Sequence, residues 1–456
     1  MRPLRLLARR PLCLLGALIG LWSLVLVKQY AFIQEIEQKP AYTPESGQVL
    51  QSATRVVDAT FNGVALEWRT GTPVSSVHCV GGGTLPPHVS WMSRSCEFTN
   101  LCYDPRSHSF GLFTSNENTQ PLSLGGINPR WLQTKGLDKN FMNIQWSPPV
   151  WNATLNGYYQ LNDVLVLFHS FAAHNVGHLL WDDFYPIYSL MRLFGLQERS
   201  FVPIRQKLEH PLYATCDIRK NKRKQCANNF VKFWPLMGVD PVTFSTNTDV
   251  RFARPGIVCA QTAVAGIGML TDHGLHDHGW EGKAWRPHNL GRGPVFEAFR
   301  DFLVERIAPQ VVVKPRVVFS MESSRDWDRR LNFTHQIQRV QRALPSADVQ
   351  GVRLWEMGLS EQIQLAASTR VLVTACGGGS MTASFLPRGS SLILMYNQTG
   401  GFDFASYKLT ESPARLDWDL LNNAGHLRVH WFPVATMESE NDLELLAHLI
   451  EHELAS

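Results

Sequence analysis

Buried strands alternate with helices along most of this 456-residue chain, and this alternation limits the possible folds more than any other feature. Short uncharged runs rich in β-branched residues predict strands, and apolar residues spaced three and four apart predict helices. Alternating strands and helices form a parallel sheet with helices on its faces, so the fold class is α/β. The first series has strands at 164–168 and 256–264 and helices at 176–193 and 294–307; the second has strands at 311–321, 370–374 and 390–396 and helices at 334–343 and 359–367.

The two series are separated near residues 305–312, and about 400 residues are too many for a single core. We therefore expect two Rossmann-like domains, at 61–308 and 309–456, the first with a cysteine-containing extension. Residues 28–60 show little periodicity and are predicted to form a stem.

The N-terminus predicts a membrane anchor. Four arginines in residues 1–10 precede an uncharged run at 11–27, which as a helix would be about 25 Å long. Positive charge on this side predicts a cytoplasmic tail at 1–10, a transmembrane signal-anchor at 11–27 and a lumenal body, that is, a single-pass type II protein. A cleaved signal peptide is the alternative, but residues 25–30 lack a small-x-small cleavage site.

A lumenal body should carry N-glycans and disulfides. The triplets that begin at Asn152, Asn332 and Asn397 are glycosylation acceptors. Seven of the eight cysteines follow the hydrophobic run, so at least one thiol stays unbridged within the chain. We expect a Cys216–Cys226 bridge and a second one between two of Cys79, Cys96 and Cys102.

The charge pattern gives little indication of a nucleic-acid partner. The formal net charge is only +4, and 18% charged with 44% hydrophobic residues indicates a globular body. The basic run at 219–224, between Cys216 and Cys226, could hold an anionic partner, but a solvated loop is the favoured interpretation.

The segment from Phe168 to Pro186 concentrates polar residues in an apolar surrounding. A strand ends at Phe168, and Asn175 is a plausible N-cap for the helix that follows. His178 and Asp182 are four residues apart and would share a helix face. A histidine and a carboxylate beyond the carboxyl end of a strand are typical of an α/β active site. The alternative is a structural N-cap with a buried His–Asp hydrogen bond.

A second motif runs from Arg370 to Pro387 as a strand, a glycine-rich turn and the start of a helix. Gly377, Gly378 and Gly379 have no Cβ, so the backbone can approach a ligand closely. The amides that open the helix, as far as Ser380, could bind phosphate oxygens. The alternative is that the glycines only serve the packing of the strand against the helix.

These motifs resemble those of glycosyltransferase family 61. The run His174-Asn-Val-Gly-His178, with Asp182, Asp183 and Pro186, is similar to the family signature N-x-G-H-x-x-x-D-x-x-x-P. The glycine turn ending in Phe385-Leu-Pro387 is similar to the family's H-G-A-G-L and F-L-P, except that Cys376 stands where the family has histidine.

The resemblance implies a GT-B arrangement, with the acceptor on the N-terminal domain and the nucleotide sugar on the C-terminal one. Asn175 and Asp183 would lie on the acceptor side, and Cys376 through Ser380 on the donor side. The segment at 319–332 is similar to a family segment in which Arg325 and Arg330 would bind the diphosphate, since guanidinium contacts phosphate bidentately. The alternative is a surface charge run neutralised by Asp326 and Asp328. Glu361 could accept from a ribose, or could act as a helix N-terminal charge.

The sequence thus predicts an inverting glycosyltransferase of the Golgi or ER membrane, with a UDP-linked nucleotide sugar as donor and a glycan or glycoprotein as acceptor. His178 or Asp182 would be the base, and no D-x-D metal motif follows a strand, so no metal or other cofactor is expected. Two alternatives are a catalytically silent lectin-like or chaperone module, favoured by Cys376, and a lumenal metallohydrolase. The metallohydrolase would use His273, His276 and His278, although their glycine-flanked setting predicts a loop.

Overall fold

The computed structural model places residues 53–456 in one compact unit. Among the described residues no helix is both long and apolar enough to cross a bilayer. The predicted tail, anchor and most of the stem precede residue 55 and lie outside the described residues. These are 55–81, 94–114, 122, 124–125, 145–170, 173–207, 215–218, 220–266, 293–322, 331–376, 378–396, 402–403, 408–409, 421, 424–433 and 439–456.

The first sheet has a parallel centre in the order β9-β13-β10-β11-β12. β10 lies between β13 and β11 and is parallel to both. With β10 to β13 taken as the first to fourth strands, their spatial order is 3-2-1-4, the order of half a Rossmann fold. The prediction of an α/β fold with a parallel sheet is therefore confirmed. The bounds are β9 Gly157–Leu161, β10 Val164–Phe168, β11 Phe201–Arg205, β12 Ser245–Thr246 and β13 Val258–Gly266.

Antiparallel strands from the N-terminal part of the chain extend this sheet. Among them, β4 pairs with β13 along most of the length of β13. The predicted stem is wrong from residue 55 onward, because β1 and β2 form a hairpin that pairs with β9. Asn62 and Gly63 supply the positive φ angles, 50° and 85°, that a tight hairpin turn needs. The strands are β1 Arg55–Phe61, β2 Val64–Thr70, β3 Ser76–Val80, β4 Ser95–Asp104, β5 Ser109–Phe113 and β8 Val150–Trp151, with a separate pair β6 Leu124–Gly125 and β7 Gln145–Trp146.

Buried polar contacts fix the turn of this hairpin to the parallel part of the sheet. The Asn62 side chain is fully buried, donates to Ser245 Oγ at 2.8 Å and accepts from the Arg251 amide at 2.9 Å. The hairpin is therefore an integral part of the first sheet.

The helices that accompany the first sheet follow the predicted order with two differences. One helix runs from Val176 to Leu193 as predicted, but its middle, η3, is a π-helix. The basic run predicted as a loop is helical from Lys220 onward, as the start of α5. The bounds are α2 Val176–His178, η3 Leu179–Phe184, α3 Tyr185–Leu193, α4 Thr215–Ile218, α5 Lys220–Phe233, η4 Trp234–Met237, η5 Pro241–Thr243 and α6 Gly293–Ile307.

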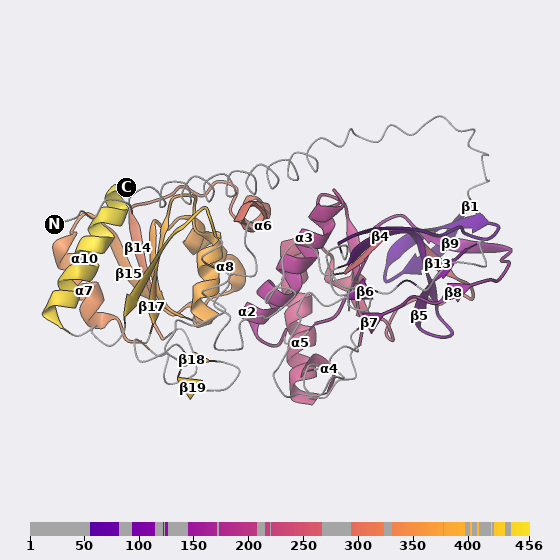
Figure 1. The fold of residues 1–456 in the computed structure, drawn as a ribbon, viewed down its shortest axis with the longest axis horizontal. Coiled ribbons are helices and arrows are strands. Elements are labelled where there is room, and N and C mark those ends of the chain that lie inside the picture. The colour runs from indigo at the N-terminus through magenta and orange to yellow at the C-terminus, as the bar shows by residue number, and fades with distance from the viewer. Residues whose placement is uncertain are drawn as a thin grey trace, which may run out of the picture. The chain divides into compact units, whose positions relative to one another are not determined.

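The second sheet consists of five parallel strands in the order β15-β14-β16-β17-β20. In chain order this is 2-1-3-4-5, the flavodoxin-like form of the doubly wound fold. Figure 1 shows α7 and α10 on one face of this sheet and α8 on the other. The bounds are β14 Arg316–Ser320, β15 Asp348–Val352, β16 Val371–Ala375, β17 Ser391–Tyr396, β20 Arg428–Pro433, α7 Thr334–Ala343, η7 Leu354–Glu356, α8 Leu359–Ala367, η8 Gly378–Phe385 and α10 Glu440–Ala455, with a separate pair β18 Phe402–Asp403 and β19 Lys408–Leu409.

The core residues of the second sheet alternate between its two faces. Phe319, Val371 and Ile393 pack with Ile450 of α10, whereas Val318 and Leu372 pack in the cluster that contains Ile363 of α8. The strand predicted at 311–321 begins only at Arg316, because Pro315 has no amide for a ladder and Val312 is 71% exposed.

Three disulfides among the described residues hold the first sheet and the helices beside it. Cys79–Cys96 and Cys216–Cys226 confirm the two expected bridges. Cys102–Cys259 joins β4 to β13 across 157 residues and was not predicted. Cys376 takes part in no disulfide among the described residues. Disulfides of this number are typical of oxidising compartments.

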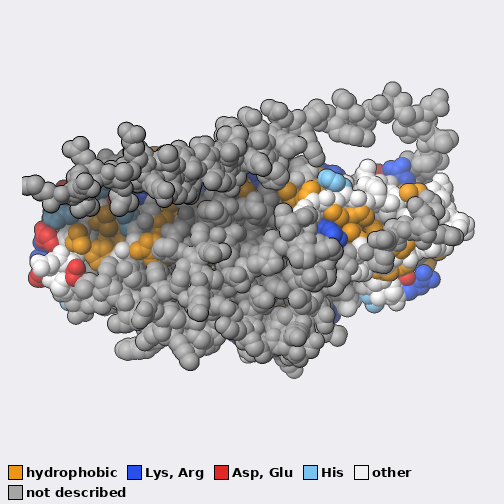
Figure 2. Space-filling view, viewed as in Figure 1, with side chains coloured by type: hydrophobic (Ala, Val, Ile, Leu, Met, Phe, Trp, Pro, Cys, Tyr) orange, Lys and Arg blue, Asp and Glu red, His pale blue; other side chains and the backbone are white. Residues whose placement is uncertain are grey.

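The described surface shows no large region of a single charge on the face seen in Figure 2, where acidic and basic side chains are scattered among hydrophobic ones. Of the three glycosylation acceptors, Asn152 and Asn332 are exposed, and Asn397 lies outside the described residues.

Candidate active site

The helix that carries the first motif begins as predicted but changes its winding at once. Asn175 Oδ1 accepts from the Gly177 amide at 3.0 Å, which confirms the N-cap. In η3 the Tyr185 amide bonds to the Leu180 carbonyl, five residues back. Short π-helical segments inside α-helices occur frequently at functional sites.

The π turn changes the geometry on which the His178–Asp182 prediction depended. That prediction used the four-residue spacing of an α-helix, and Leu179–Phe184 follows a wider turn. His178 is partly buried, and the side chain of Asp182 lies outside the described residues. The catalytic role of this pair stays a prediction, without the shared α-helical face.

Asp183 lies in the interior rather than at the surface. Its side chain is fully buried, and Oδ2 accepts from Ser170 Oγ at 2.8 Å. This bond ties η3 to the loop that leaves β10. The acceptor-side role predicted for Asp183 is untested, whereas a role in holding the loop on the helix is visible.

The structure brings the first motif against the second through Met381, which directly follows Ser380. A Cβ added to Gly177 would lie 3.5 Å from Met381 Cγ. The indole N–H of Trp181 points at Met381 Sδ. The helix after Asn175 and the glycine-rich turn are therefore neighbours, as an active site formed by both motifs requires.

The second motif begins at the topological switch point of the second sheet. β14 lies between β15 and β16, so the connections after β14 and β16 diverge and leave a crevice at the carboxyl ends of these strands. Ligands of doubly wound folds bind at this position. The segment that contains Arg325 and Arg330 follows β14, and Cys376 with the glycines follows β16. Arg325, Arg330 and Gly377 lie outside the described residues.

The described ends of these two strands are mostly buried. Ser320, the last residue of β14, is fully buried, and its hydroxyl has no hydrogen-bond partner among the described residues. Cys376 is partly buried, and its amide bonds to the Met395 carbonyl at 3.2 Å. Ser380 is fully buried in η8, which is a 3-10 helix rather than the start of an α-helix. The donor-binding roles of Cys376, Gly378, Gly379 and Ser380 remain predictions.

Glu361 is engaged within its own helix. Its Oε2 accepts from the Gly358 amide at 2.6 Å, the contact of a residue that caps the start of α8. The structure thus shows the helix N-terminal role that the sequence offered as one of two alternatives.

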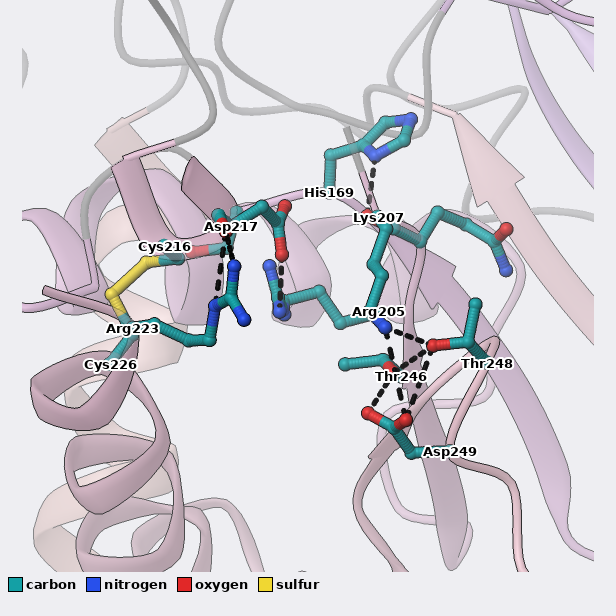
Figure 3. Close-up of polar contacts among 12 residues, drawn as sticks. His169, Arg205, Lys207, Cys216, Asp217, Arg223, Cys226, Thr246, Thr248 and Asp249 are labelled. Atoms are coloured by element: carbon teal, nitrogen blue, oxygen red, sulfur yellow. Dashed lines mark hydrogen bonds and ion pairs between the residues drawn. A yellow bond between two sulfur atoms is a disulfide. The ribbon is translucent and has the colours of Figure 1, made fainter. Parts of the chain in front are cut away.

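Sequence reasoning missed a polar cluster at the carboxyl ends of β10, β11 and β12, which we call the carboxyl-edge cluster (Figure 3). Arg205, the last residue of β11, is 5% exposed, and its guanidinium pairs with Asp217 at 2.8 Å. His169 Nδ1 lies 2.8 Å from the Gln206 carbonyl, so Nδ1 carries the hydrogen. In the sequence, the signal for this cluster was the arginine at the end of an otherwise uncharged strand. The members are His169, Arg205, Gln206, Lys207, Asp217, Thr246, Thr248 and Asp249.

Burial sets the protonation of His169. Removal of the ring from water lowers the pKa of His169 to about 4; the nearby Arg205 lowers it further, while the Gln206 carbonyl and Asp217 act in the opposite direction. Burial alone would raise the pKa of Asp249, but hydrogen bonds from Thr246 and Thr248 and the charge of Lys207 hold it below its usual value.

A second buried polar group lies where α3, η8 and the turn before β20 approach each other. Burial raises the pKa of the Tyr185 hydroxyl, and the Ser384 hydroxyl acts in the opposite direction. Both hydroxyls are buried and lack partners of hydrogen-bond geometry among the described residues. Burial also lowers the pKa of His426 to about 4, and the charges of Arg300 and Arg388 contribute in the same direction.

Because burial lowers the pKa of both His169 and His426, we expect the protein to lose stability in acid. Each is neutral in the folded state down to about pH 4 but binds a proton near pH 6.5 when unfolded. The unfolded state therefore binds more protons between these values, and stability falls as the pH is lowered from about 6.5 to about 4. Each histidine should contribute about 3 kcal/mol to this loss. Urea unfolding at pH 7 and pH 4 measures this loss. His426→Asn should remove about half of the histidine contribution, and an unchanged pH dependence in that variant would contradict the assignment.

No three potential metal ligands converge within the part of the chain that the structure describes. His273, His276 and His278 of the metallohydrolase alternative lie outside it.

No protein-family model matches the chain, and no curated protein matches it either. Among solved structures, the chain is similar to the bacterial iron-containing dodecameric glycosyltransferase TibC from enterotoxigenic E. coli H10407. The match has 10% sequence identity, a TM-score of 0.27, and covers 91% of this chain and 100% of that one. A likeness at this level supports no statement about the fold or activity of this chain, so the resemblance to family 61 stays a prediction.

Proposed function

We propose that this protein is a glycosyltransferase that transfers a sugar from a nucleotide sugar, UDP-linked, to a hydroxyl of a glycan or glycoprotein. One observation carries the proposal. The glycine-rich turn and the arginine-containing segment follow the two strands that flank the switch point of a flavodoxin-like sheet. Doubly wound sheets bind nucleotides at this point. The helix of the first motif contacts the same turn through Met381.

In the proposed reaction the sugar is transferred with inversion in one displacement. His178 or Asp182 removes the proton of the acceptor hydroxyl, whose oxygen bonds to the sugar anomeric carbon. The bond from that carbon to the diphosphate breaks, and the diphosphate leaves with the electron pair. Arg325, Arg330 and the backbone amides of Gly378–Ser380 stabilise its charge, so the reaction needs no metal ion.

The proposal includes the cellular location. Three disulfides and two exposed glycosylation acceptors support a body in the lumen of the secretory pathway. The basic flank and uncharged run at residues 11–27 support a type II anchor in the Golgi or ER membrane.

UDP should raise the melting temperature of the full-length protein. A ligand that binds only the folded state stabilises it, by about 2.7 kcal/mol at one hundred times its dissociation constant. Arg330→Ala should remove most of this shift, because the guanidinium would contact the diphosphate. Differential scanning fluorimetry with UDP, GDP and CDP measures it.

The matched control is Arg342→Ala, which removes an exposed arginine from α7 at a distance in sequence from both motifs. It should leave the UDP shift intact. No shift with any of the three nucleotides at millimolar concentration would refute donor binding and favour the silent lectin-like or chaperone module.

A further inference from the structure

The first turns of α5 concentrate positive charge where a helix tolerates it least. Lys222, Arg223 and Lys224 lie near the N-terminus of this 14-residue helix, and its first turn holds no acidic residue. The helix macrodipole is positive at this end, so cations here repel the helix as well as one another. An arrangement that opposes helix stability suggests that the charge serves another purpose.

The structure holds this basic turn firmly in place. The Cys216–Cys226 disulfide closes the α4–α5 corner. The Arg223 guanidinium donates to the Asp217 carbonyl, with Nε at 3.0 Å, while the Asp217 carboxylate pairs with Arg205 (Figure 3). The basic turn is therefore joined to the carboxyl end of β11.

The same helix contacts the loop that leads into the first motif. Asn229 Nδ2 donates to the Ala173 carbonyl at 2.7 Å, two residues before the N-cap Asn175. Phe230 packs edge-on against Phe168, the last residue of β10. Arg223 precedes Asn229 by six residues, which is about 9 Å along a helix axis. An oligosaccharide bound at the proposed acceptor side could therefore also contact the basic turn.

Unpartnered donors at this edge also point to a ligand. Arg205 is 95% buried, and although Nη2 contacts Asp217, Nη1 has no partner among the described residues. The Gln206 amide nitrogen is also buried without a described partner. Buried donors left unpaired are costly, so an acceptor-rich group is expected beside them.

We infer that the basic turn of α5, together with Arg205 at the end of β11, is a subsite for an oxyanion on the acceptor glycan, a carboxylate or a sulfate. This inference rests on the proposed function and names the class of its acceptor. Lysine and arginine side chains carry positive charge and only donate hydrogen bonds, so they suit an oxyanion better than a neutral hydroxyl. The Asp217 carboxylate pairs with Arg205, and no carboxylate pairs with Lys222, Arg223 or Lys224 among the described residues.

The test is direct binding of the full-length protein in detergent to two matched pairs of oligosaccharides. The first pair is tetragalacturonate and its methyl ester, which differ in charge. The second is a sulfated galactan tetrasaccharide and its unsulfated form. The charged member of at least one pair should bind at least tenfold tighter, and the favoured pair distinguishes carboxylate from sulfate. Raising the salt concentration should weaken this preference.

Matched variants locate the site. Lys224→Glu changes an exposed residue in the basic turn, and Lys232→Glu makes the same charge change at the other end of the same helix. Lys224→Glu should lower the affinity for the charged oligosaccharide about tenfold, and Lys232→Glu should leave it nearly unchanged. Equal binding within both oligosaccharide pairs, or equal losses in the two variants, would overturn the inference.

Two further outcomes distinguish a failure of this inference from a failure of the proposed transferase function on which it rests. Binding of phosphatidylserine vesicles, lost in Lys224→Glu, without preference for any charged oligosaccharide, would assign the turn to a membrane surface and overturn the inference. Oxyanion preference in a protein that binds no nucleotide would refute the proposed transferase while leaving the anionic glycan site in place.

Discussion

His178→Ala is expected to lower the rate of sugar transfer by about 10²–10⁴, the usual contribution of a general base, and Asp182→Asn should do the same if the carboxylate is the base. Nucleotide binding should persist in both variants, because the proposed donor site is on the second sheet. Turnover with a UDP-sugar and the thermal shift with UDP, measured on one preparation, separate the two effects.

A structural role for His178 or Asp182 makes a different prediction. The variant would then melt several degrees lower and lose nucleotide binding together with activity. His335→Gln, which changes an exposed histidine on α7, is the matched control and should alter neither quantity. Parent rates in folded, UDP-binding variants of both residues would show that neither His178 nor Asp182 is the catalytic base.

Removal of the Cys102–Cys259 bridge should destabilise the protein by about 5 kcal/mol, because it closes a loop of 157 residues. The double variant Cys102→Ala with Cys259→Ala tests this by urea unfolding. Such a loss is comparable to the whole stability of many domains, so the variant should also accumulate poorly at 37 °C.

The Cys216–Cys226 bridge is a suitable comparison because its cysteines are equally buried but only 10 residues apart. Its removal should cost about 3 kcal/mol. The difference between the two double variants therefore isolates the effect of loop length. Equal losses of unfolding free energy in the two double variants would mean that the long loop is already ordered in the unfolded chain. They could also mean that strain in the folded protein offsets the stability gained by closing the longer loop.

Local sequence patterns were sufficient where the structure is locally determined. The helices at Thr334–Ala343 and Leu359–Ala367 have the predicted bounds, and the strand–turn order at the glycine motif is correct. Apolar periodicity and helix-start signals act over a few residues, so the sequence displays them directly.

Features that depend on distant residues were missed. The structural role of Asn62 depends on its contacts with Ser245 and Arg251, which lie nearly two hundred residues later in the sequence. The sequence therefore predicted a stem where the hairpin forms. The Arg205–Asp217 ion pair could be predicted only with knowledge of which segment covers the carboxyl end of β11.

The π turn at Leu179–Phe184 was missed for a different reason. It inserts a wider turn into a sequence whose apolar spacing fits an α-helix, and no residue in it signals the change.

The place of β13 in the first sheet has a consequence for synthesis. This strand pairs with β9 through residues 258–260 and with β10 through residues 263–264, but it is made roughly 90 residues after β10 ends. At translation rates of about 5–20 residues per second, the edges of β9 and β10 that pair with β13 stay open for about 5–20 s. Open strand edges are prone to wrong pairing during such an interval. A nascent chain halted before Val258 should therefore be bound by chaperones and sensitive to protease, and one released beyond Gly266 should become resistant.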